Sequence, residues 1–265
     1  MKEEQRNITF AVCNWEEIAT FSADYIRAAQ ISFDSYCEDR LLECKHYKMT
    51  AGERLVGCFS IGESTTIRQF FVVPEFAELS QELFARVKKF ENVSQAMVHS
   101  GDELFLSHCF DAFERLEKQA YLFEYSSREF PAAESVSLRL ADLKNTEDLK
   151  IIALSGDFFE EELENAKNGI DIAKIYVAEA DGHVIGFGII QYGVVITENA
   201  SIGMFVCEEF RQRGYAGSIL RGLRAILDAG GYRVISGCWY YNHNSKKSIQ
   251  SAGGHSKSRL LHFYF

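Results

Sequence analysis

The sequence has very little proline and no long apolar run. Only Pro74 and Pro131 occur among its 265 residues, which argues against a Pro-rich linker or a low-complexity tail. No uninterrupted apolar stretch approaches about 18 residues, so we expect no membrane-spanning helix. The polar residues 1–6 lack the apolar core of a signal peptide. These absences predict a soluble, cytoplasmic protein without a membrane partner.

Paired cysteines are also missing. The seven cysteines are scattered and odd in number, and none belongs to a Cys-x-x-Cys pair. A structural zinc site needs paired ligands at short spacing, and a secreted disulfide framework needs an even count in a short chain. We therefore expect reduced, mostly buried thiols and no metal site.

Acidic side chains are in excess, but the charge is unevenly distributed. The formal net charge is -10. Residues 1–130 carry 14 basic and 22 acidic side chains, residues 131–210 carry 5 and 15, and residues 211–265 carry 9 and 1. An acidic chain argues against nonspecific nucleic-acid binding, whereas a basic segment within it fits a local anionic ligand. A solvated basic face is the alternative explanation of that segment.

Hydrophobic periodicity in the second half predicts the order β-α-β-β-β-α-β-α-β. Asp181-Gly182 between two apolar runs is a strong hairpin signal, and Gly230-Gly231 ends the most amphipathic helix. This order predicts an α/β (α+β) fold with a mixed, mostly antiparallel sheet flanked by helices. The expected strands are 135–140, 174–180, 183–192, 200–206, 232–239 and 259–265, and the expected helices are 146–168, capped by Thr146, 215–229 and 245–252.

The first half repeats the later part of this order. VVPEF, which starts at Val72, aligns with VCEEF, which starts at Val206, at an offset of 134 residues. We therefore predict two lobes in tandem, 1–130 and 131–265, with a boundary near Phe130-Pro131. A single continuous domain with an N-terminal extension is the alternative. The expected strands are 54–60, 65–73, 93–99 and 119–125, and the expected helices are 76–90 and 102–116.

A basic loop with small residues joins strand 200–206 to the next helix. The first turn of a helix leaves backbone N–H groups unpaired, and its dipole favours negative charge. Small residues let an oxyanion approach the backbone, and arginines add charge-assisted donors. The loop suits a pyrophosphate, although it has neither the Gly-Lys-Ser/Thr ending nor the Gly-x-Gly-x-x-Gly pattern. Its residues are Arg211, Gln212, Arg213, Gly214, Tyr215, Ala216 and Gly217.

Arg211-x-x-Gly214-x-Ala216 resembles the signature of the GNAT superfamily, the acetyl-CoA-dependent N-acetyltransferases. Downstream, Asn242-x-x-Ser245 followed by Gly253-Gly254 resembles the last conserved block of that family. The resemblance covers about residues 133–265. It implies a twisted GNAT-like sheet, acetyl-CoA as cosubstrate without a metal, and direct attack by a primary amine of a small molecule or an amino terminus.

The resemblance also implies which residues hold the coenzyme. Strands 200–206 and 232–239 would separate to admit the thioester, and main-chain groups of the first would pair with the pantetheine arm. The loop amides would hold the pyrophosphate, and Asn242 with Ser245 would line the far side of the groove. The implied cofactor-binding set is Phe205, Val206, Arg211, Gln212, Arg213, Gly214, Tyr215, Ala216, Gly217, Asn242 and Ser245.

Catalytic residues are less well defined, because the sequence departs from the family pattern. The family often places an acid tyrosine at the position of Ile249, an aromatic at Gly254 and a proline at Glu208. We take Glu198 as the base, although a solvated loop acid explains it equally well. The acid is left among Tyr240, Tyr241 and His243, of which we choose Tyr241. The missing tyrosine motivates an alternative function, a CoA-binding regulatory module with little turnover.

The first lobe lacks the loop chemistry, so we expect it to be a degenerate copy that binds no CoA. At the repeat offset, Ala77, Leu79, Ser80 and Glu82 stand opposite Arg211, Arg213, Gly214 and Ala216. A carboxylate against a pyrophosphate is unfavourable. The role of this first lobe would be to complete a sheet, shape the acceptor cleft or form a homodimer interface. We expect His99 and His108 to be packing residues, and the core to include Phe70, Phe71, Phe84, Phe105, Phe110 and Phe113.

Overall fold

The computed structural model describes residues 7–90, 92–126, 136–170 and 172–265. It contains two compact units, Met1–Tyr121 with Ser258–Phe265, and Leu122–Lys257. The predicted boundary at Phe130-Pro131 lies outside the described residues. Strand β6 begins in the first unit and ends in the second, and β12 begins in the second and ends in the first. The units are therefore interleaved, and the division into lobes 1–130 and 131–265 stays a prediction.

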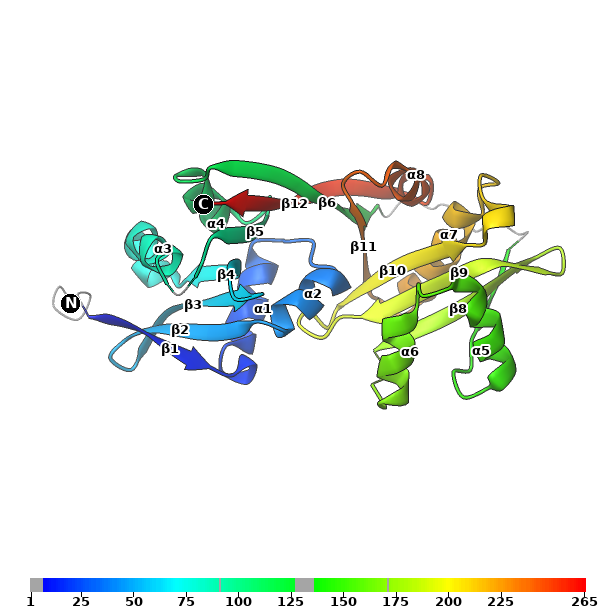
Figure 1. The fold of residues 1–265 in the computed structure, drawn as a ribbon, viewed down its shortest axis with the longest axis horizontal. Helices are drawn as coiled ribbons and strands as arrows, with labels where there is room; N and C mark the ends of the chain where they lie inside the picture. The colour runs from blue at the N-terminus through cyan, green and yellow to red at the C-terminus, as the bar shows by residue number, and fades with distance from the viewer. Residues whose placement is uncertain (1–6, 91, 127–135, 171) are drawn as a thin grey trace. The chain divides into compact units, whose positions relative to one another are not determined.

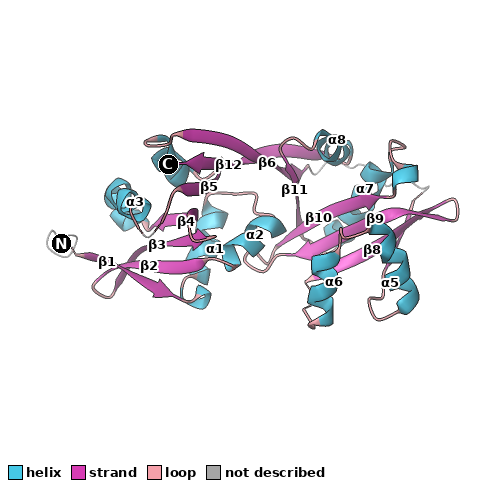
Figure 2. Cartoon of the chain, in the orientation of Figure 1, coloured by secondary structure: helices cyan, strands magenta, loops and turns pink. Residues whose placement is uncertain are grey.

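The order β-α-α-β-β-β-α-β-α-β occurs twice along the chain (Figures 1 and 2). The first copy is β1 (Ile8–Cys13), α1 (Ala19–Ala28), α2 (Ser35–Leu42), β2 (Lys45–Ala51), β3 (Arg54–Gly62), β4 (Thr66–Val72), α3 (Ser80–Lys88), β5 (Gln95–His99), α4 (Glu103–Phe110) and β6 (Arg115–Tyr125). The second is β7 (Ser137–Leu140), α5 (Thr146–Ile152), α6 (Glu160–Lys167), β8 (Ala173–Ala180), β9 (His183–Tyr192), β10 (Asn199–Val206), α7 (Tyr215–Ala229), β11 (Arg233–Trp239), α8 (His243–Ser251) and β12 (Gly254–Tyr264). The repeat is more complete than the sequence predicted, because β1, α1, α2 and β2 were not expected.

Each unit has a mixed, mostly antiparallel sheet, which confirms the predicted fold class. The strand order is β1-β2-β3-β4-β5-β12 in the first unit and β6-β11-β10-β9-β8-β7 in the second. The neighbours β4 and β5 are parallel, as are β10 and β11. The hairpin at Asp181-Gly182 is confirmed, with both residues at positive φ (50° and 75°).

Two predicted helices were too long. The helix expected over 146–168 is interrupted at Gly156, whose φ of 64° breaks the helical backbone, and its cap is Asn145 rather than Thr146. The helix expected over 102–116 ends at Phe110, because β6 already begins at Arg115. The helix expected over 215–229 has the predicted bounds.

Helices cover both faces of the second unit's sheet. Phe159, which precedes α6, packs with Phe187 of β9 on one face, at a ring distance of 5.8 Å. On the other face, Leu223 of α7 lies against Gly188, where a side chain would collide with it. Figure 1 shows α5 and α6 in front of these strands and α7 behind them. The sheet therefore holds α7, and with it the preceding loop, in a fixed place.

The aromatic core of the first unit is smaller than predicted. Phe70, Phe84 and Phe105 are buried, but Phe110 is 49% and Phe113 39% exposed. Phe110 is the last residue of α4 and Phe113 follows it, and both pack edge-on against Phe263 (5.2 and 5.6 Å), so they cover the core without entering it. His99 and His108 are buried next to phenylalanine rings, as expected. All seven cysteines are free thiols, and six of them are buried.

Two buried ionisable groups lie between β5 and α4. The Asp102 carboxylate accepts hydrogen bonds from the Phe105 N–H (3.1 Å), which caps α4, and from the Tyr25 hydroxyl. Burial raises the pKa of Asp102 to about 6 and lowers the pKa of His99 to about 4. Burial therefore favours the uncharged form of each group.

These groups are expected to give opposite pH dependences of stability. The raised pKa of Asp102 contributes stability below about pH 4 that is lost as the pH rises through 6, whereas the lowered pKa of His99 contributes stability above about pH 6.5 that is lost as the pH falls through 4. Relative to the parent, Asp102→Asn should gain about 3 kcal/mol of unfolding free energy across this range as pH rises, and His99→Phe should lose about as much. Urea unfolding between about pH 4 and 7 measures both, and parallel profiles for all three proteins would contradict the assignment.

Candidate functional site

Strands β10 and β11 separate after a short paired stretch. Their parallel pairing covers only Asn199–Ser201 of β10, and the last pair is Ser201 with Ile235. Both strands continue, to Val206 and to Trp239, and Figure 1 shows β11 turning away from β10. We call this gap the fork, with its apex at Ser201 and Ile235 and its mouth at Val206 and Trp239. The predicted separation of these strands is confirmed.

The loop after β10 presents an uncapped helix terminus at the mouth. Gln212 and Gly214 both have left-handed backbones, with φ of 65° and 84°. Gly214 is the N-cap residue of α7 and supplies no side-chain cap, so the first N–H groups of the helix, at Tyr215–Gly217, have no side-chain acceptor there. The loop from Arg211 to Gly214 is exposed. This geometry suits an anion that approaches from solvent.

The two loop arginines are bonded to the loop's own backbone. Arg211 donates from Nε to the Val206 carbonyl (3.2 Å), and Arg213 donates to the Glu209 carbonyl (2.9 Å). Each guanidinium also lies near an aromatic ring, that of Phe205 or Phe210. Both side chains therefore brace the turn while adding positive charge beside it.

The backbone of β10 faces the fork at every second residue. The backbone carbonyl of Glu198, just before β10, accepts a hydrogen bond from the Arg233 N–H of β11 (2.9 Å). The Val206 carbonyl, which accepts from Arg211, points to the same side of the strand. Cys207 instead donates to the Ile185 carbonyl of β9 (3.0 Å). By strand alternation the main-chain groups of Met204 face the fork, whereas those of Phe205 face β9. The predicted main-chain set therefore includes Phe205, whose main-chain groups face β9, and leaves out Met204, whose groups face the fork.

Asn242 and Ser245 lie together at the start of α8. The Asn242 side chain accepts a hydrogen bond from the Ser245 N–H (3.0 Å), so the pair forms the helix cap. Seven residues after the asparagine, Ile249 is buried, and its side chain fills the place where a Cβ on Gly254 would stand (2.5 Å). The two departures from the family pattern are thus coupled, because the isoleucine packs where an aromatic after the glycine would collide.

Gly217 has a packing reason that differs from the predicted one. A Cβ at this position would lie 2.4 Å from the Ser251 hydroxyl of α8. Arg221 donates to the Ser251 carbonyl (3.1 Å) and ties the same two helices together. Close contact between α7 and α8 therefore favours glycine at 217, because a Cβ there would displace the Ser251 hydroxyl, whereas the positive φ of Gly214 favours glycine at 214.

The predicted base and acid lie at opposite ends of the fork. Glu198 is exposed in the turn before β10, beyond the closed apex. Tyr241 is 54% exposed at the mouth, where its ring packs edge-on against Trp239 (5.1 Å). The Arg233 N–H donates to the backbone carbonyl of Glu198. Tyr241 lies eight residues after Arg233, which corresponds to about 26 Å of extended chain. The structure therefore does not bring the two together, and they cannot act on one amine as a pair.

The first unit has a similar fork without a similar loop. Its strands β4 and β5 pair only at Thr66 and Ile67. A 3-10 turn at Pro74–Leu79 runs directly into α3, where the Ser80 N–H is bonded to the Ala77 carbonyl and no residue takes a positive φ. Beyond the last pair, the Gln69 side chain is buried and accepts from the Ser22 hydroxyl (3.1 Å). The first unit therefore has the strand fork without the left-handed, uncapped loop.

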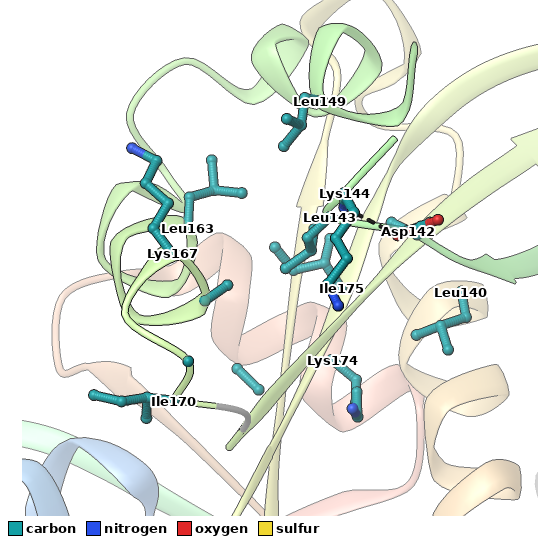
Figure 3. Close-up of a pocket in the computed structure, with 14 residues that line it drawn as sticks. Leu140, Asp142, Leu143, Lys144, Leu149, Leu163, Lys167, Ile170, Lys174 and Ile175 are labelled. Atoms are coloured by element: carbon teal, nitrogen blue, oxygen red, sulfur yellow. Dashed lines mark hydrogen bonds between the residues drawn. The ribbon is translucent and has the colours of Figure 1, made fainter. Parts of the chain in front are cut away.

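A cavity of about 650 Å³ lies elsewhere in the second unit (Figure 3). Leu163 of α6 and Ile175 of β8 are part of its apolar wall, and Lys144 and Lys174 are among the polar residues around it. Strand β9 lies between β8 and β10, and no residue of the loop 211–217 lines the cavity. The cavity is therefore separate from the fork.

Two kinds of feature are absent from the described ranges, a metal-binding cluster and a membrane-spanning helix. Within them, no group of three or more His, Cys, Asp or Glu side chains is arranged to hold a metal ion. No helix in those ranges is both long and apolar enough to cross a membrane.

Comparison with known proteins identifies the fold. Residues 14–126 match a family model described as an acetyltransferase (GNAT) domain. An acetyltransferase of the GNAT family from Colwellia psychrerythraea is similar, with a TM-score of 0.84, 20% identity, and coverage of 98% of this chain and 99% of that chain. A tandem GNAT protein from the clavulanic acid biosynthesis pathway (TM-score 0.59, 13% identity, 97% and 98% covered) and a GCN5-related N-acetyltransferase from Sphaerobacter thermophilus (0.59, 14%, 97% and 95%) are also similar. No curated protein matches the chain.

Residues 14–126 are therefore similar to a GNAT acetyltransferase domain, and the similar structures show that the chain has the GNAT fold. The similar structures extend over nearly all of it, so its repeated element order represents two GNAT folds in tandem. The family match lies in the first half, for which no CoA site is predicted, whereas the signature-like loop lies in the second. The family-model match and the signature-like loop thus lie in different copies.

Proposed function

We propose that the second unit binds acetyl-CoA and transfers its acetyl group to a primary amine, either of a small molecule or of an amino terminus. The observation that carries this proposal is the left-handed, uncapped loop at Gln212–Gly214, placed at the mouth of a strand fork. An anionic pyrophosphate is favoured at such a helix terminus. A pantetheine arm entering from this end would run along β10 toward the apex.

The reaction needs positioning more than elaborate acid–base chemistry. The amine nitrogen attacks the thioester carbonyl, a C–N bond forms, the C–S bond breaks, and the CoA thiol leaves with the proton that the amine loses. The Met204 N–H, which faces the fork, is placed to donate to the carbonyl oxygen as negative charge develops there. Holding both reactants in attack geometry supplies a large part of the rate. Glu198 and Tyr241 stay predictions for the base and the acid, and their separation argues against joint action.

We propose that the first unit is a degenerate copy that binds no CoA. The straight entry into α3 and the buried Gln69–Ser22 contact support this assignment. Its role would be structural, including the shaping of an acceptor cleft or a homodimer interface. The acidic segment 131–210 would favour encounter with a cationic acceptor, because complementary charge raises association rates. We place the activity in the cytoplasm and assign it no nucleic-acid partner.

Calorimetric titration with acetyl-CoA, followed by an amine panel assayed for released thiol, tests these proposals. We expect one CoA per chain and thiol release with at least one amine. Two CoA per chain would refute the degenerate copy. Binding without thiol release on a broad panel would favour the alternative, a regulatory module with little turnover, for which the buried isoleucine at 249 is the supporting observation. No binding would refute both.

A further inference from the structure

A serine hydroxyl takes over where the backbone pairing of the fork ends. In a continued parallel ladder, a backbone N–H of β11 would donate to the Ile202 carbonyl, which is the next fork-facing carbonyl of β10. Instead the Ser236 hydroxyl donates to it, at 2.9 Å. Ser236 is only 1% exposed. The apex is therefore closed by a buried side chain rather than by the ladder.

A tyrosine from the first copy's last strand holds this serine. The Tyr125 hydroxyl lies 2.9 Å from Ser236 Oγ, and because Ser236 donates its own proton to Ile202, Tyr125 is the donor of this second bond. Its ring lies under the guanidinium of Arg224 (5.6 Å), which α7 supplies and which also donates to the Ser126 carbonyl. Burial raises the pKa of Tyr125 to about 12, so its hydroxyl stays a donor at neutral pH.

Two side chains thus limit the free edge of β10. Arg211 occupies the Val206 carbonyl at the mouth, and Ser236 occupies the Ile202 carbonyl at the apex. Met204 lies between them, and its fork-facing groups have no strand partner in the described β10–β11 pairing. This edge is the stretch along which a bound thioester would lie.

The length of this edge restricts the acyl group. Two residues of extended strand separate Met204 from Ile202, or about 7 Å. Each acyl carbon beyond the carbonyl advances about 1.3 Å, and the terminal carbon needs about 4 Å to its neighbour. An acetyl methyl fits in this distance, whereas the third carbon beyond a butyryl carbonyl does not.

We propose that Ser236, held by Tyr125, closes the apex of the fork and thereby selects short acyl thioesters, acetyl over butyryl. The inference rests on the proposed function, because it assumes a CoA thioester along β10. Ser236 and Tyr125 are positioning residues, since they act through the shape of the fork.

The first unit offers an internal comparison. One residue beyond its last strand pair, Ile67 with Ala96, the position that corresponds to Ser236 is occupied by Met97. Tyr264, which ends β12 as Tyr125 ends β6, bonds instead to Glu117 (3.2 Å) and lies 3.1 Å from His262 Nδ1. Among the described residues, the serine–tyrosine closure therefore accompanies the copy that also has the open loop.

The test is calorimetric titration with acetyl-CoA and butyryl-CoA. The parent chain should bind acetyl-CoA at least about 10-fold more tightly than butyryl-CoA, in the range that one excess methylene gives in a closed pocket. Ser236→Gly should reduce this ratio to about 2 or less, and Tyr125→Phe should reduce it about 3-fold. Ser236→Thr keeps the hydroxyl and should keep the ratio. If Ser236 and Tyr125 had only a structural role, their substitution would lower the affinities for acetyl-CoA and butyryl-CoA equally.

Ser258→Ala is the matched control, because Ser258 is a buried strand serine whose hydroxyl has no partner among the described residues. It should leave the ratio unchanged. If the Ser236→Gly variant does not unfold cooperatively, the ratio is measured with the Tyr125→Phe variant instead. Equal affinity of the parent for both thioesters, or an unchanged ratio in the folded variants, overturns this inference alone. A parent chain that binds neither thioester overturns the proposed function as well.

Discussion

Replacing Gly214 by glutamate together with Arg211 by alanine is expected to lower acetyl-CoA affinity by at least about 100-fold. Gly214 has a φ of 84°, where a side chain costs about 1–2 kcal/mol. The new carboxylate would stand at the helix terminus that is proposed to receive the pyrophosphate, and like charges brought together there cost several kcal/mol. The alanine removes the side chain that braces Val206. Calorimetry with acetyl-CoA measures the loss.

The control must separate ligand repulsion from backbone strain. Gly231→Glu introduces the same side chain at a similar φ (75°), but it follows the other end of α7, about 25 Å away along the helix. This control variant should therefore carry a similar backbone strain and keep the affinity for acetyl-CoA. Gly214→Ala, which adds strain without charge, should keep measurable binding. If the folded double variant binds like its parent, the loop at 211–217 is not the pyrophosphate site.

Local signals predicted much of the second half, because they come from residues close in sequence. The bounds of α7 follow from its apolar stripe and from the glycines at both ends, and the β8–β9 hairpin follows from Asp181-Gly182. The segment that forms β1, α1, α2 and β2 gave no such signal. Helix α1 buries Ser22 and Ala23 beside Ile26, so small and polar residues hide the apolar period. In β2, the buried set includes a histidine, His46, which also weakens the alternation.

The candidate loop could be predicted from the sequence, whereas the closed apex of the fork could not. The residues of the loop lie within seven positions, so their chemistry is readable as a motif. Tyr125 and Ser236 are 111 positions apart, and nothing local joins a tyrosine ending one strand to a serine in another. The fork-facing role of Met204 depends on which carbonyls Ser236 and Arg211 occupy, which is a tertiary fact. The distance between Glu198 and Tyr241 is likewise a tertiary fact, because it depends on where β10 and β11 pair and where they separate.

Expressing residues 1–130 and 131–265 as separate chains is expected to give two fragments that do not unfold cooperatively. The interleaved units explain why, since each fragment lacks a strand end that its unit contains. The second unit would lose Leu122 and Phe123 of β6, and the first would lose Leu260 and Phe263 of β12, all at most 3% exposed. Two such side chains are worth about 3–6 kcal/mol, which approaches the whole stability of a typical domain.

Mixing the two fragments should restore what each lacks. We expect a cooperative thermal transition and acetyl-CoA binding from the equimolar mixture, and neither from 131–265 alone, because that fragment carries Ser236 and Arg224 without Tyr125. The matched control is the full chain cut between residues 130 and 131 after folding, which keeps both strand ends in place and should bind like the intact protein. If 131–265 alone melts cooperatively and binds acetyl-CoA with full affinity, strand β6 is dispensable to the second unit. The closure of the fork by Tyr125 would then be wrong as well.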